Sequence, residues 1–379
     1  YIKMEFIVSS SDLLSQLNTI KGVINSKNTL QILNCFIFTL DGNTLKIEAS
    51  DLETTLETSL VLENVKGSGV IAIDAKKLTD MLGLFSDEPL TFKIDLTNYK
   101  IHILSASGEY DIVGMSGEEF PKNQALADNS SSFTVPAEVL QKAVASTSFA
   151  TSDDDARPIL TGILFELTDE HLRLVATDSH KLARYTRTDV KAENNASFIF
   201  PKKPANILKN ILNKEAADNA VNVKFDEKQV IISLTNFVLN CRLIEGKYPN
   251  YAAVIPAQNP NVLQINKMDF YQKLRRVAYF ADPSNGLVKL EMSGSSLSIK
   301  AQNLDSDSKA AEELNCNYEG DDDMKIGFKS KFLLTILDNI NSEDVSIQMS
   351  DPSRAGIIVP VDKPDENEDV LMLLMPMMI

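Results

Sequence analysis

The segment RPILTGILFELTDEHLRLVATD, residues Arg157–Asp178, recurs elsewhere in the chain, and this repetition indicates how the chain is organised. A similar segment, TLQILNCFIFTLDGNTLKIEASD, occupies Thr29–Asp51, so that the two final aspartates are 127 residues apart. Each segment has the pattern of a strand, a polar turn and a second strand that ends in Asp. A weaker third copy, GLVKLEMSGSSLSIKAQN, occupies Gly286–Asn303. The chain is therefore built from an internal repeat.

The repeat extends on both sides of this hairpin. A short strand and apolar residues at helical spacing precede each copy, and a second helix candidate follows it. Phe120-Pro121 and Tyr248-Pro249 close the first two copies, 128 residues apart. This order of elements indicates an α+β fold with antiparallel sheets rather than a βαβ parallel sheet. We expect three tandem domains, at residues 1–125, 126–258 and 259–379.

The overall composition is that of a soluble globular protein. The 379 residues are 44% hydrophobic and 24% charged, which fits two to four domains of roughly 100–200 residues each. The longest apolar run, Val370–Ile379, is far shorter than the ~20 residues that span a bilayer. No segment has the layout of a secretion signal, so we expect a cytoplasmic protein that is not bound to membranes. Residues 1–3 are expected to be a remnant that precedes the natural start at Met4.

The residues that carry chemistry are sparse, and we expect no enzyme, no metal and no cofactor. The three cysteines and three histidines show no metal-ligand spacing. Asp178-Ser179-His180 suggests a hydrolase, but a Ser and a His adjacent in sequence do not form a triad in the usual way. Asp51 and Asn303 occupy the positions equivalent to Asp178, which favours a turn over catalysis. Phosphate-binding and dinucleotide-binding loops are also missing from the sequence.

Positive charge is concentrated in the helix candidates. The chain has a net charge of −16, yet the six candidates hold 15 Lys and Arg against 5 Asp and Glu. The other residues hold 22 Lys and Arg against 48 Asp and Glu. This reversal predicts that the helices share a face that meets a polyanion, although solvated lysines on ordinary helices are the simpler alternative. The candidates are residues 10–27, 75–85, 136–148, 201–214, 266–280 and 329–340.

The C-terminal segment VLMLLMPMMI allows two interpretations. A buried last strand explains Val370–Leu374 well. It explains Met375–Met378 less well, because Pro ends ladder pairing and termini tend to lie at the surface. Methionine side chains suit a surface that accepts several partners. A peptide-binding patch and a packed terminal strand both remain open on these residues alone.

Three motifs in this order, ATDSHKL at Ala176–Leu182, YPNY at Tyr248–Tyr251 and LMPM at Leu374–Met377, resemble those of one family. It is the bacterial DNA sliding clamp, the β subunit of DNA polymerase III, and the resemblance covers Met4–Ile379. It implies a head-to-tail homodimeric ring of clamp-type domains, with antiparallel sheets outside and two helices per domain inside. The ring would hold double-stranded DNA without regard to sequence and act as a processivity factor. The partners implied are the replicative polymerase, the clamp loader, repair polymerases and other clamp-motif proteins.

The resemblance also implies roles for individual residues. Lys27 and Arg157 match positions that contact DNA, and the helix charges add Lys202, Lys203, Lys209, Lys273, Arg275 and Arg276. Lys77, Tyr110, Ile112, Tyr279 and Phe280 match positions in the subunit interface. The pocket for partner peptides would use Leu160, Thr177, His180, Leu182, Pro249, Val254, Leu373, Met375, Pro376 and Met377.

Two features depart from the family pattern. Met378 replaces the basic residue that often follows the Met-Pro tail, and Asp362–Asp369 form an acidic insertion with no assigned role. The alternative function is a triplicated scaffold protein that does not touch DNA. A scaffold of that kind predicts no reversal of charge between the helices and the rest of the chain.

Overall fold

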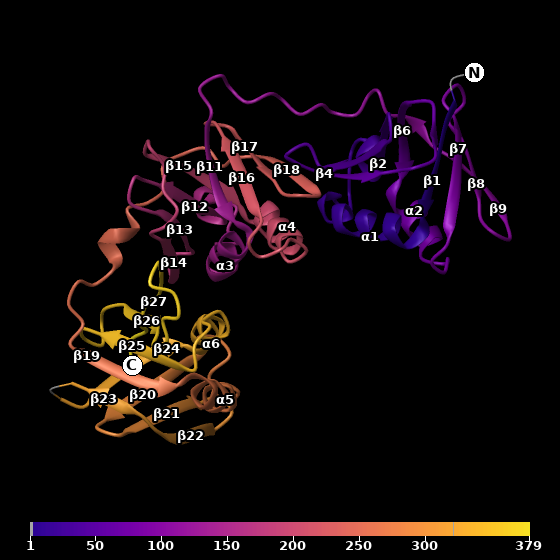
Figure 1. Ribbon diagram of the computed structural model, residues 1–379. Coiled ribbons are helices and arrows are strands. Elements are labelled where there is room, and N and C mark those ends of the chain that lie inside the picture. The colour runs from indigo at the N-terminus through magenta and orange to yellow at the C-terminus, as the bar shows by residue number, and fades with distance from the viewer. Residues whose placement is uncertain (1–2, 321) are drawn as a thin grey trace. The chain divides into compact units, whose positions relative to one another are not determined.

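A computed structural model describes residues 3–320 and 322–379. The chain forms two compact units (Figure 1). Unit 1 contains the residues up to Gln141 together with Lys203–Leu243, and unit 2 contains Lys142–Lys202 together with Ile244–Ile379. Each unit therefore combines an outer third of the chain with part of the middle repeat. Of the expected remnant, residues 1 and 2 lie outside the described residues, and Lys3 begins the first strand opposite Asp95.

Unit 1 contains a five-stranded and a nine-stranded sheet, in which neighbouring strands are antiparallel. The smaller sheet has the order β5-β1-β7-β8-β9, with β1 Lys3–Ser9, β5 Val65–Lys66, β7 Pro89–Asp95, β8 Lys100–Leu104 and β9 Glu109–Val113. The larger has the order β10-β6-β2-β3-β4-β18-β17-β16-β11. Its strands are β2 Cys35–Asp41, β3 Thr44–Ser50, β4 Thr54–Val61, β6 Gly69–Asp74, β10 Met115–Ser116, β11 Ser131–Pro136, β16 Ala220–Phe225, β17 Gln229–Ser233 and β18 Phe237–Arg242.

Unit 2 repeats this plan with a nine-stranded and a four-stranded antiparallel sheet. The larger sheet has the order β15-β12-β13-β14-β27-β26-β25-β19-β23. Its strands are β12 Gly162–Leu167, β13 Leu172–Thr177, β14 Lys181–Arg187, β15 Ala196–Pro201, β19 Asn261–Asn266, β23 Asn317–Glu319, β25 Asp344–Met349, β26 Gly356–Pro360 and β27 Glu368–Leu374. The smaller has the order β22-β21-β20-β24, with β20 Leu287–Ser293, β21 Ser296–Asn303, β22 Ser308–Asn315 and β24 Met324–Lys329. The predicted α+β class with antiparallel sheets is confirmed.

All six helix candidates are helices, but each is shorter than predicted. They are α1 Ser10–Ile20, α2 Ala75–Leu82, α3 Ala137–Ser148, α4 Lys202–Leu212, α5 Lys267–Ala278 and α6 Ser330–Asp338. Side chains cap three of them: Ser9, Asp74 and Asn266 accept N–H bonds from the first turns of α1, α2 and α5. The early ends leave Lys21, Lys27 and Lys214 outside the helices, and the start of α6 at Ser330 excludes Lys329. The positive excess therefore lies mainly in α4 and α5, which corrects the sequence-based estimate.

The helices pack against the sheets through apolar faces. In unit 1, α1 contacts β1 of the smaller sheet and β4 of the larger one, and it buries Leu13, Leu17 and Ile20. In unit 2, α5 contacts strands of both sheets and buries Phe270 and Leu274. The pairs α1–α2 and α5–α6 are also in contact. Each helix pair thus presents one apolar side to the core and leaves its charged side exposed.

The aspartates that end the repeated hairpins shape a turn. Asp51 Oδ1 accepts hydrogen bonds from the N–H groups of the residues two and three positions later, and Asp178 Oδ1 does the same. The residues that follow, Leu52 and Ser179, have φ values of 79° and 78°. Asn303 accepts the equivalent bond from the Asp305 N–H. The interpretation of this position as a turn is confirmed.

Candidate partner-peptide and DNA sites

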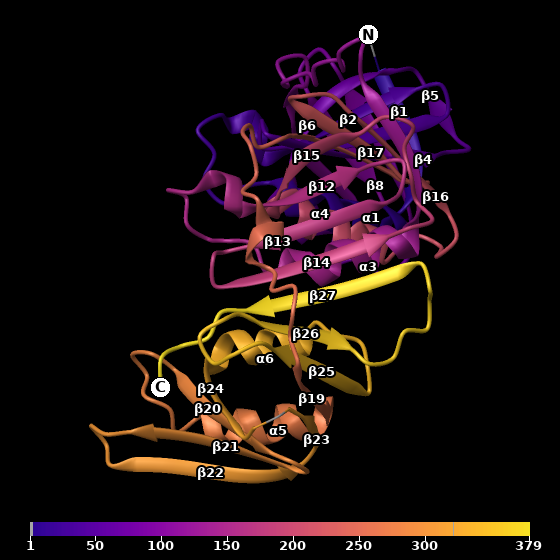
Figure 2. The ribbon, with the colours of Figure 1, turned by 90° about the vertical axis from the view of Figure 1, so that its left-hand side faces the viewer.

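An apolar cluster in unit 2 surrounds the junction of β14 and β27. Leu182 on β14 lies opposite Leu373 on β27, two strands that Figure 2 shows side by side. Leu160 reaches the same cluster from the 3₁₀ helix η3, Pro158–Thr161. We call this cluster the apolar site; its buried residues are Leu160, Leu164, Val175, Leu182, Ile199, Tyr248, Ala355, Ile357, Leu371 and Leu373. Three predicted pocket residues are thus brought together.

Tyr248 fixes one wall of the apolar site. Its hydroxyl accepts the N–H of Thr177 at 3.1 Å, and burial raises the pKa of this hydroxyl above its usual range. Pro249 follows at the surface, and Val254, with 51% of its surface exposed, ends the 3₁₀ helix η4, Tyr251–Val254. Tyr251, which begins the same 3₁₀ helix, and Ile255, which follows Val254, pack against the cluster. The structure therefore places Pro249 and Val254 next to the apolar site but with exposed side chains.

After β27 the C-terminal tail is held by main-chain hydrogen bonds to the turn before β14 and to β24. Leu371–Leu374 are buried, whereas Met375 is 41% and Met378 96% exposed. This agrees with a buried last strand that is followed by residues at the surface. The Met375 N–H donates to the His180 carbonyl at 2.9 Å, and the Met377 N–H donates to the Gly327 carbonyl at 2.8 Å. Pro376 lies between these two anchors and is half-buried. The predicted residues Met375, Pro376 and Met377 therefore form one segment, which is hydrogen-bonded to the main chain of the predicted residue His180.

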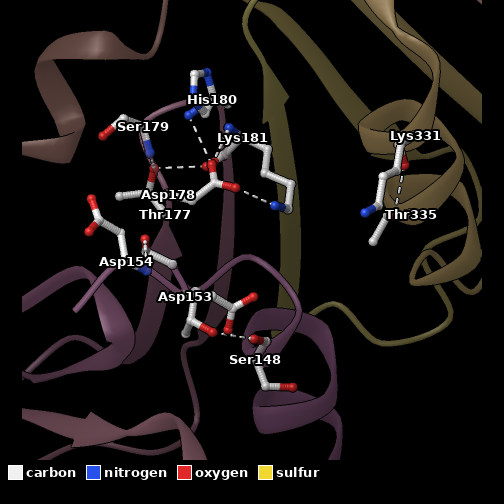
Figure 3. A network of polar contacts seen from close by, with 12 residues as sticks. Ser148, Asp153, Asp154, Thr177, Asp178, Ser179, His180, Lys181, Lys331 and Thr335 are labelled. Carbon is white, nitrogen blue, oxygen red and sulfur yellow. Dashed lines mark hydrogen bonds and ion pairs between the residues drawn. The ribbon is translucent and has the colours of Figure 1, made fainter. Parts of the chain in front are cut away.

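A polar network lies at the turn before β14 (Figure 3). Asp178 forms an ion pair with Lys181, whose ammonium lies 4.6 Å from the ring centroid of Phe332 on α6. The His180 ring stacks on the same phenyl ring, at 5.7 Å between centroids. The turn is therefore tied to α6 through Phe332, whose ring also lies 5.2 Å from the Lys329 ammonium. These contacts hold the main chain of His180, to which the tail is bonded.

Most of the predicted DNA-contact residues are held by carboxylates. Arg157 donates to Asp154 at 3.0 Å and to the Ser179 hydroxyl at 2.9 Å. Other pairs in the two units are Lys202–Asp153 at 2.5 Å, Lys203–Asp51 at 2.5 Å, Lys273–Asp269 at 3.4 Å and Arg276–Glu312 at 2.5 Å. Lys203 also donates to the Val23 carbonyl and to Asn25, so it lies beside the loop that carries Lys27. Lys27, Lys209 and Arg275 form no ion pair among the residues that the structure describes.

The predicted interface residues divide between exposed and buried positions. Tyr279 is 87% and Phe280 38% exposed, and both follow directly after α5. Lys77 is exposed on α2, and Tyr110 is 39% exposed on β9. Ile112, in contrast, is only 7% exposed and belongs to the core of unit 1. Four of the five side chains are thus available for contact with another chain.

Comparison with known proteins decides the family. Three models of one family match consecutive parts of the chain: the N-terminal domain of the DNA polymerase III beta subunit at residues 4–124, its central domain at 134–250 and its C-terminal domain at 252–378. The chain belongs to the DNA polymerase III beta subunit family. Its three repeats are three tandem clamp domains, and its function is that of a sliding clamp.

Relatives within this family match along the whole chain. The protein is 26% identical to the beta sliding clamp of Pseudomonas aeruginosa, over 99% of this chain and 100% of that one. It is also 26% identical to the clamp of Streptococcus pneumoniae, over 98% of this chain and 99% of that one. A crystal structure of the P. aeruginosa clamp bound to griselimycin superposes with a TM-score of 0.93 at 25% identity, covering 99% and 100% of the chains. The corresponding structure from Bartonella birtlesii gives 0.91 at 26% identity, covering both chains completely.

The acidic insertion of this family member is folded rather than loose. Its last residues, Glu368 and Asp369, are the start of β27, which corrects the predicted boundary of the last strand. Arg187 on β14 holds Asp365 at 2.5 Å, and Arg184 holds Asp369 at 3.1 Å. The segment therefore pairs with two arginines of β14 within unit 2.

Sequence reasoning missed several residues around the apolar site. Tyr248 stands in the quoted YPNY motif, and that motif was the signal for it. Ile357 and Leu371 look like any residues of buried strands, and Phe332 looks like a core residue of a helix. Gly327 carries no signal at all, although the tail is bonded to it. No helix in residues 3–320 and 322–379 has the length and apolar character needed to cross a membrane.

Proposed function

We propose that two copies of this clamp form a closed head-to-tail ring around double-stranded DNA in the cytoplasm. The ring tethers the replicative polymerase, the clamp loader, repair polymerases and other clamp-motif proteins, and it carries out no reaction of its own. One observation carries this proposal: three tandem clamp domains occupy the chain from residue 4 to residue 378. Three domains per chain make six per dimer, and a heterologous contact that closes produces a ring.

Two open sheet edges support the closure of the ring. In the described structure β9 ends the five-stranded sheet of unit 1, and β22 ends the four-stranded sheet of unit 2. An edge strand exposes unpaired N–H and C=O groups and is a template for pairing with another chain. Exposed apolar residues accompany each edge: Leu84 and Val113 in unit 1, Tyr279 in unit 2. We propose that β9 of one copy meets β22 of the other.

The basic residues of α4 and α5 are the proposed contacts to DNA. Phosphate contacts position a protein on the duplex without reading its sequence, which suits a ring that slides. In the absence of DNA, carboxylates pair with several of these cations. When DNA enters, phosphates replace the carboxylates, so each contact is weak and easily exchanged.

The apolar site is the proposed receptor for partner peptides. A short peptide with Gln followed by Leu-Phe anchors would insert between Leu182, Leu373 and the exposed Met375. Burial of each anchor contributes roughly 1.5–3 kcal/mol, and the cost of ordering the peptide reduces the sum. Modest affinity results, which suits partners that exchange on one ring. The methionines of the tail adapt to motif variants because their side chains are flexible.

Titration of a fluorescent clamp-motif peptide tests this receptor. Deletion of Met375–Ile379 removes the tail but leaves β27 intact, so the deletion variant should lose peptide binding while it remains a dimer. A control variant, Met268→Ala, removes a half-exposed methionine of α5 and should bind as the unmodified protein does. Equal binding by the intact and the truncated protein would show that the tail is a packed terminus and not part of a receptor.

A further inference from the structure

Two adjoining cavities lie in unit 1, on either side of the segment Pro121–Asn123. One encloses about 410 Å³ and the other about 340 Å³, and all three residues of the segment line both. The second cavity follows the junction of β4 and β18, where its wall includes Thr55 and Asn240. We call the second cavity the junction groove, lined among others by Ser50, Thr55, Lys122, Lys228, Asn240 and Arg242.

The junction groove is the repeat counterpart of the apolar site. Thr55 on β4 lies opposite Asn240 on β18, just as Leu182 on β14 lies opposite Leu373 on β27. Thr55 and Leu182 are 127 residues apart, which is the offset of the first two repeats. Pro121 likewise corresponds to Pro249. The fold therefore provides the same junction twice, and the first copy has polar side chains where the second has leucines.

The charge of the junction groove is opposite to that of the chain. Lys122, Lys228 and Arg242 line it against one acidic residue, Glu53, whereas the whole chain has a net charge of −16. Glu53 lies 3.5 Å from Arg242, and both side chains are more than 60% exposed, so this ion pair is easily opened. An excess of cations thus remains available to a ligand.

The neutral lining of the groove also favours a polar ligand. Gln229 donates to the carbonyls of Gln124 and Ala125, which anchors the segment that forms the rim. Asn240 and Thr55 present an amide and a hydroxyl where the apolar site presents methyl groups. The Thr55 hydroxyl donates to Ser50 Oγ at 3.0 Å, so an apolar anchor placed here would cover mainly the Asn240 amide, which is costly. A volume of about 340 Å³ holds a few side chains and is too small for a duplex.

We propose that the junction groove binds an acidic peptide segment of a partner protein. The carboxylates of the segment pair with Lys122, Lys228 and Arg242, while its backbone bonds to Asn240 and Thr55. The comparison with the apolar site rests on the proposed function, but the argument from charge and volume does not. The clamp would then have a second receptor whose specificity is electrostatic, so a partner carrying both motifs could use both.

A fluorescein-labelled hexaglutamate peptide, titrated into the full-length protein at low salt and followed by anisotropy, tests this proposal. The variant Lys228→Glu with Arg242→Glu should weaken binding by about tenfold or more, because both charge contacts become repulsive. The matched control is Lys93→Glu with Lys224→Glu, two exposed lysines of unit 1 outside the groove, and it should bind as the unmodified protein does. If thermal melting shows that the reversed variant is unfolded, Lys228→Gln with Arg242→Gln should still weaken binding severalfold.

The clamp-motif peptide, titrated into the same preparations, separates this proposal from the proposed function. Its binding should be unchanged in the groove variants, and hexaglutamate binding should survive deletion of Met375–Ile379. No binding of hexaglutamate, or an equal loss in the control and groove variants, would overturn the groove whatever the clamp-motif peptide does. Displacement of bound hexaglutamate by a short DNA duplex in equimolar amount would also overturn it, since the groove would then be a phosphate site.

Discussion

Gly327 determines the course of the C-terminal tail although it has no side chain. Its carbonyl accepts the Met377 N–H, and the tail passes directly above its Cα. A Cβ added here would overlap Ile379 Cγ2, and it would lie 2.8 Å from Leu287 Cδ1 and 3.0 Å from the Met377 carbonyl oxygen. Glycine is needed at this position because another backbone approaches it closely.

Substitution of Gly327 should therefore release the tail. In Gly327→Val we expect the clamp-motif peptide to bind several times more weakly, with the fold of unit 2 retained, since valine suits a strand. Peptide anisotropy measures the loss of peptide binding. The rate at which carboxypeptidase removes Ile379 measures the release of the tail. Gly22→Val is the control, because a Cβ there meets nothing within 4 Å. Unchanged peptide affinity in both variants would contradict a role for the tail's position.

Arg187 joins β14 to the acidic insertion. Its side chain is only 9% exposed and donates to Asp189 and to Asp365, each at 2.5 Å. The backbone N–H of Asn367 and the Arg187 guanidinium together hold the pKa of the Asp365 carboxyl below its ordinary value of 3.8. A carboxyl with a lowered pKa stabilises the fold above its unfolded pKa, and this contribution is lost as the pH falls through the folded pKa.

Removal of Arg187 should destabilise unit 2 in a pH-dependent way. We expect Arg187→Met to lower the free energy of unfolding at neutral pH, because two partly exposed carboxylates lose their common partner. The difference from the unmodified protein should shrink as the pH is lowered toward about 3, where the carboxyls take up protons. Urea unfolding at both pH values measures it, with the exposed Lys191→Met as control. A difference that is independent of pH would mean that Arg187 acts by packing alone.

At the scale of elements, helical periodicity identified all six helices, and the repeat identified the antiparallel hairpins. The strand pairs β4–β18 and β14–β27 could not be predicted, because residues far apart in sequence meet there. This pairing brings Leu182 and Leu373 together, so the sequence indicated the members of the apolar site only through family resemblance. Residues such as Ile357 were missed because their pattern is that of any buried strand. Helix ends were also placed too late, since the 3₁₀ turn η1, Lys21–Val23, continues the apolar pattern of α1.

The helix α5 should bind DNA more tightly when Glu312, the carboxylate that pairs with its Arg276, is neutralised. Glu312 on β22 accepts two hydrogen bonds from Arg276, which hold the pKa of this carboxyl below its ordinary value. In Glu312→Gln the guanidinium is freed from an ion pair, and we expect duplex affinity at low salt to rise about twofold. Glu227→Gln removes the same charge from an exposed turn of unit 1 and should change affinity less. If both variants bind alike, net charge and not Arg276 controls the contact.

At the scale of the whole molecule, ring closure requires a dimer. Tyr279→Glu with Phe280→Glu places charges where two exposed aromatic rings now lie 5.6 Å apart, and we expect this variant to sediment as a monomer. Val61→Glu is the control, because Val61 is 82% exposed on β4, away from both open edges. A monomeric state of the unmodified protein at micromolar concentration would contradict the proposed ring.

Retention on circular DNA is the test of the proposed closed ring. Clamps loaded by a clamp loader onto nicked circular DNA, and separated from free protein by gel filtration, should remain bound because a closed ring cannot leave a circle. Linearisation of the same DNA should release them, since a ring that contacts only phosphates slides off an end. Retention that is equal on circular and linear DNA, or absent from both, would contradict topological tethering.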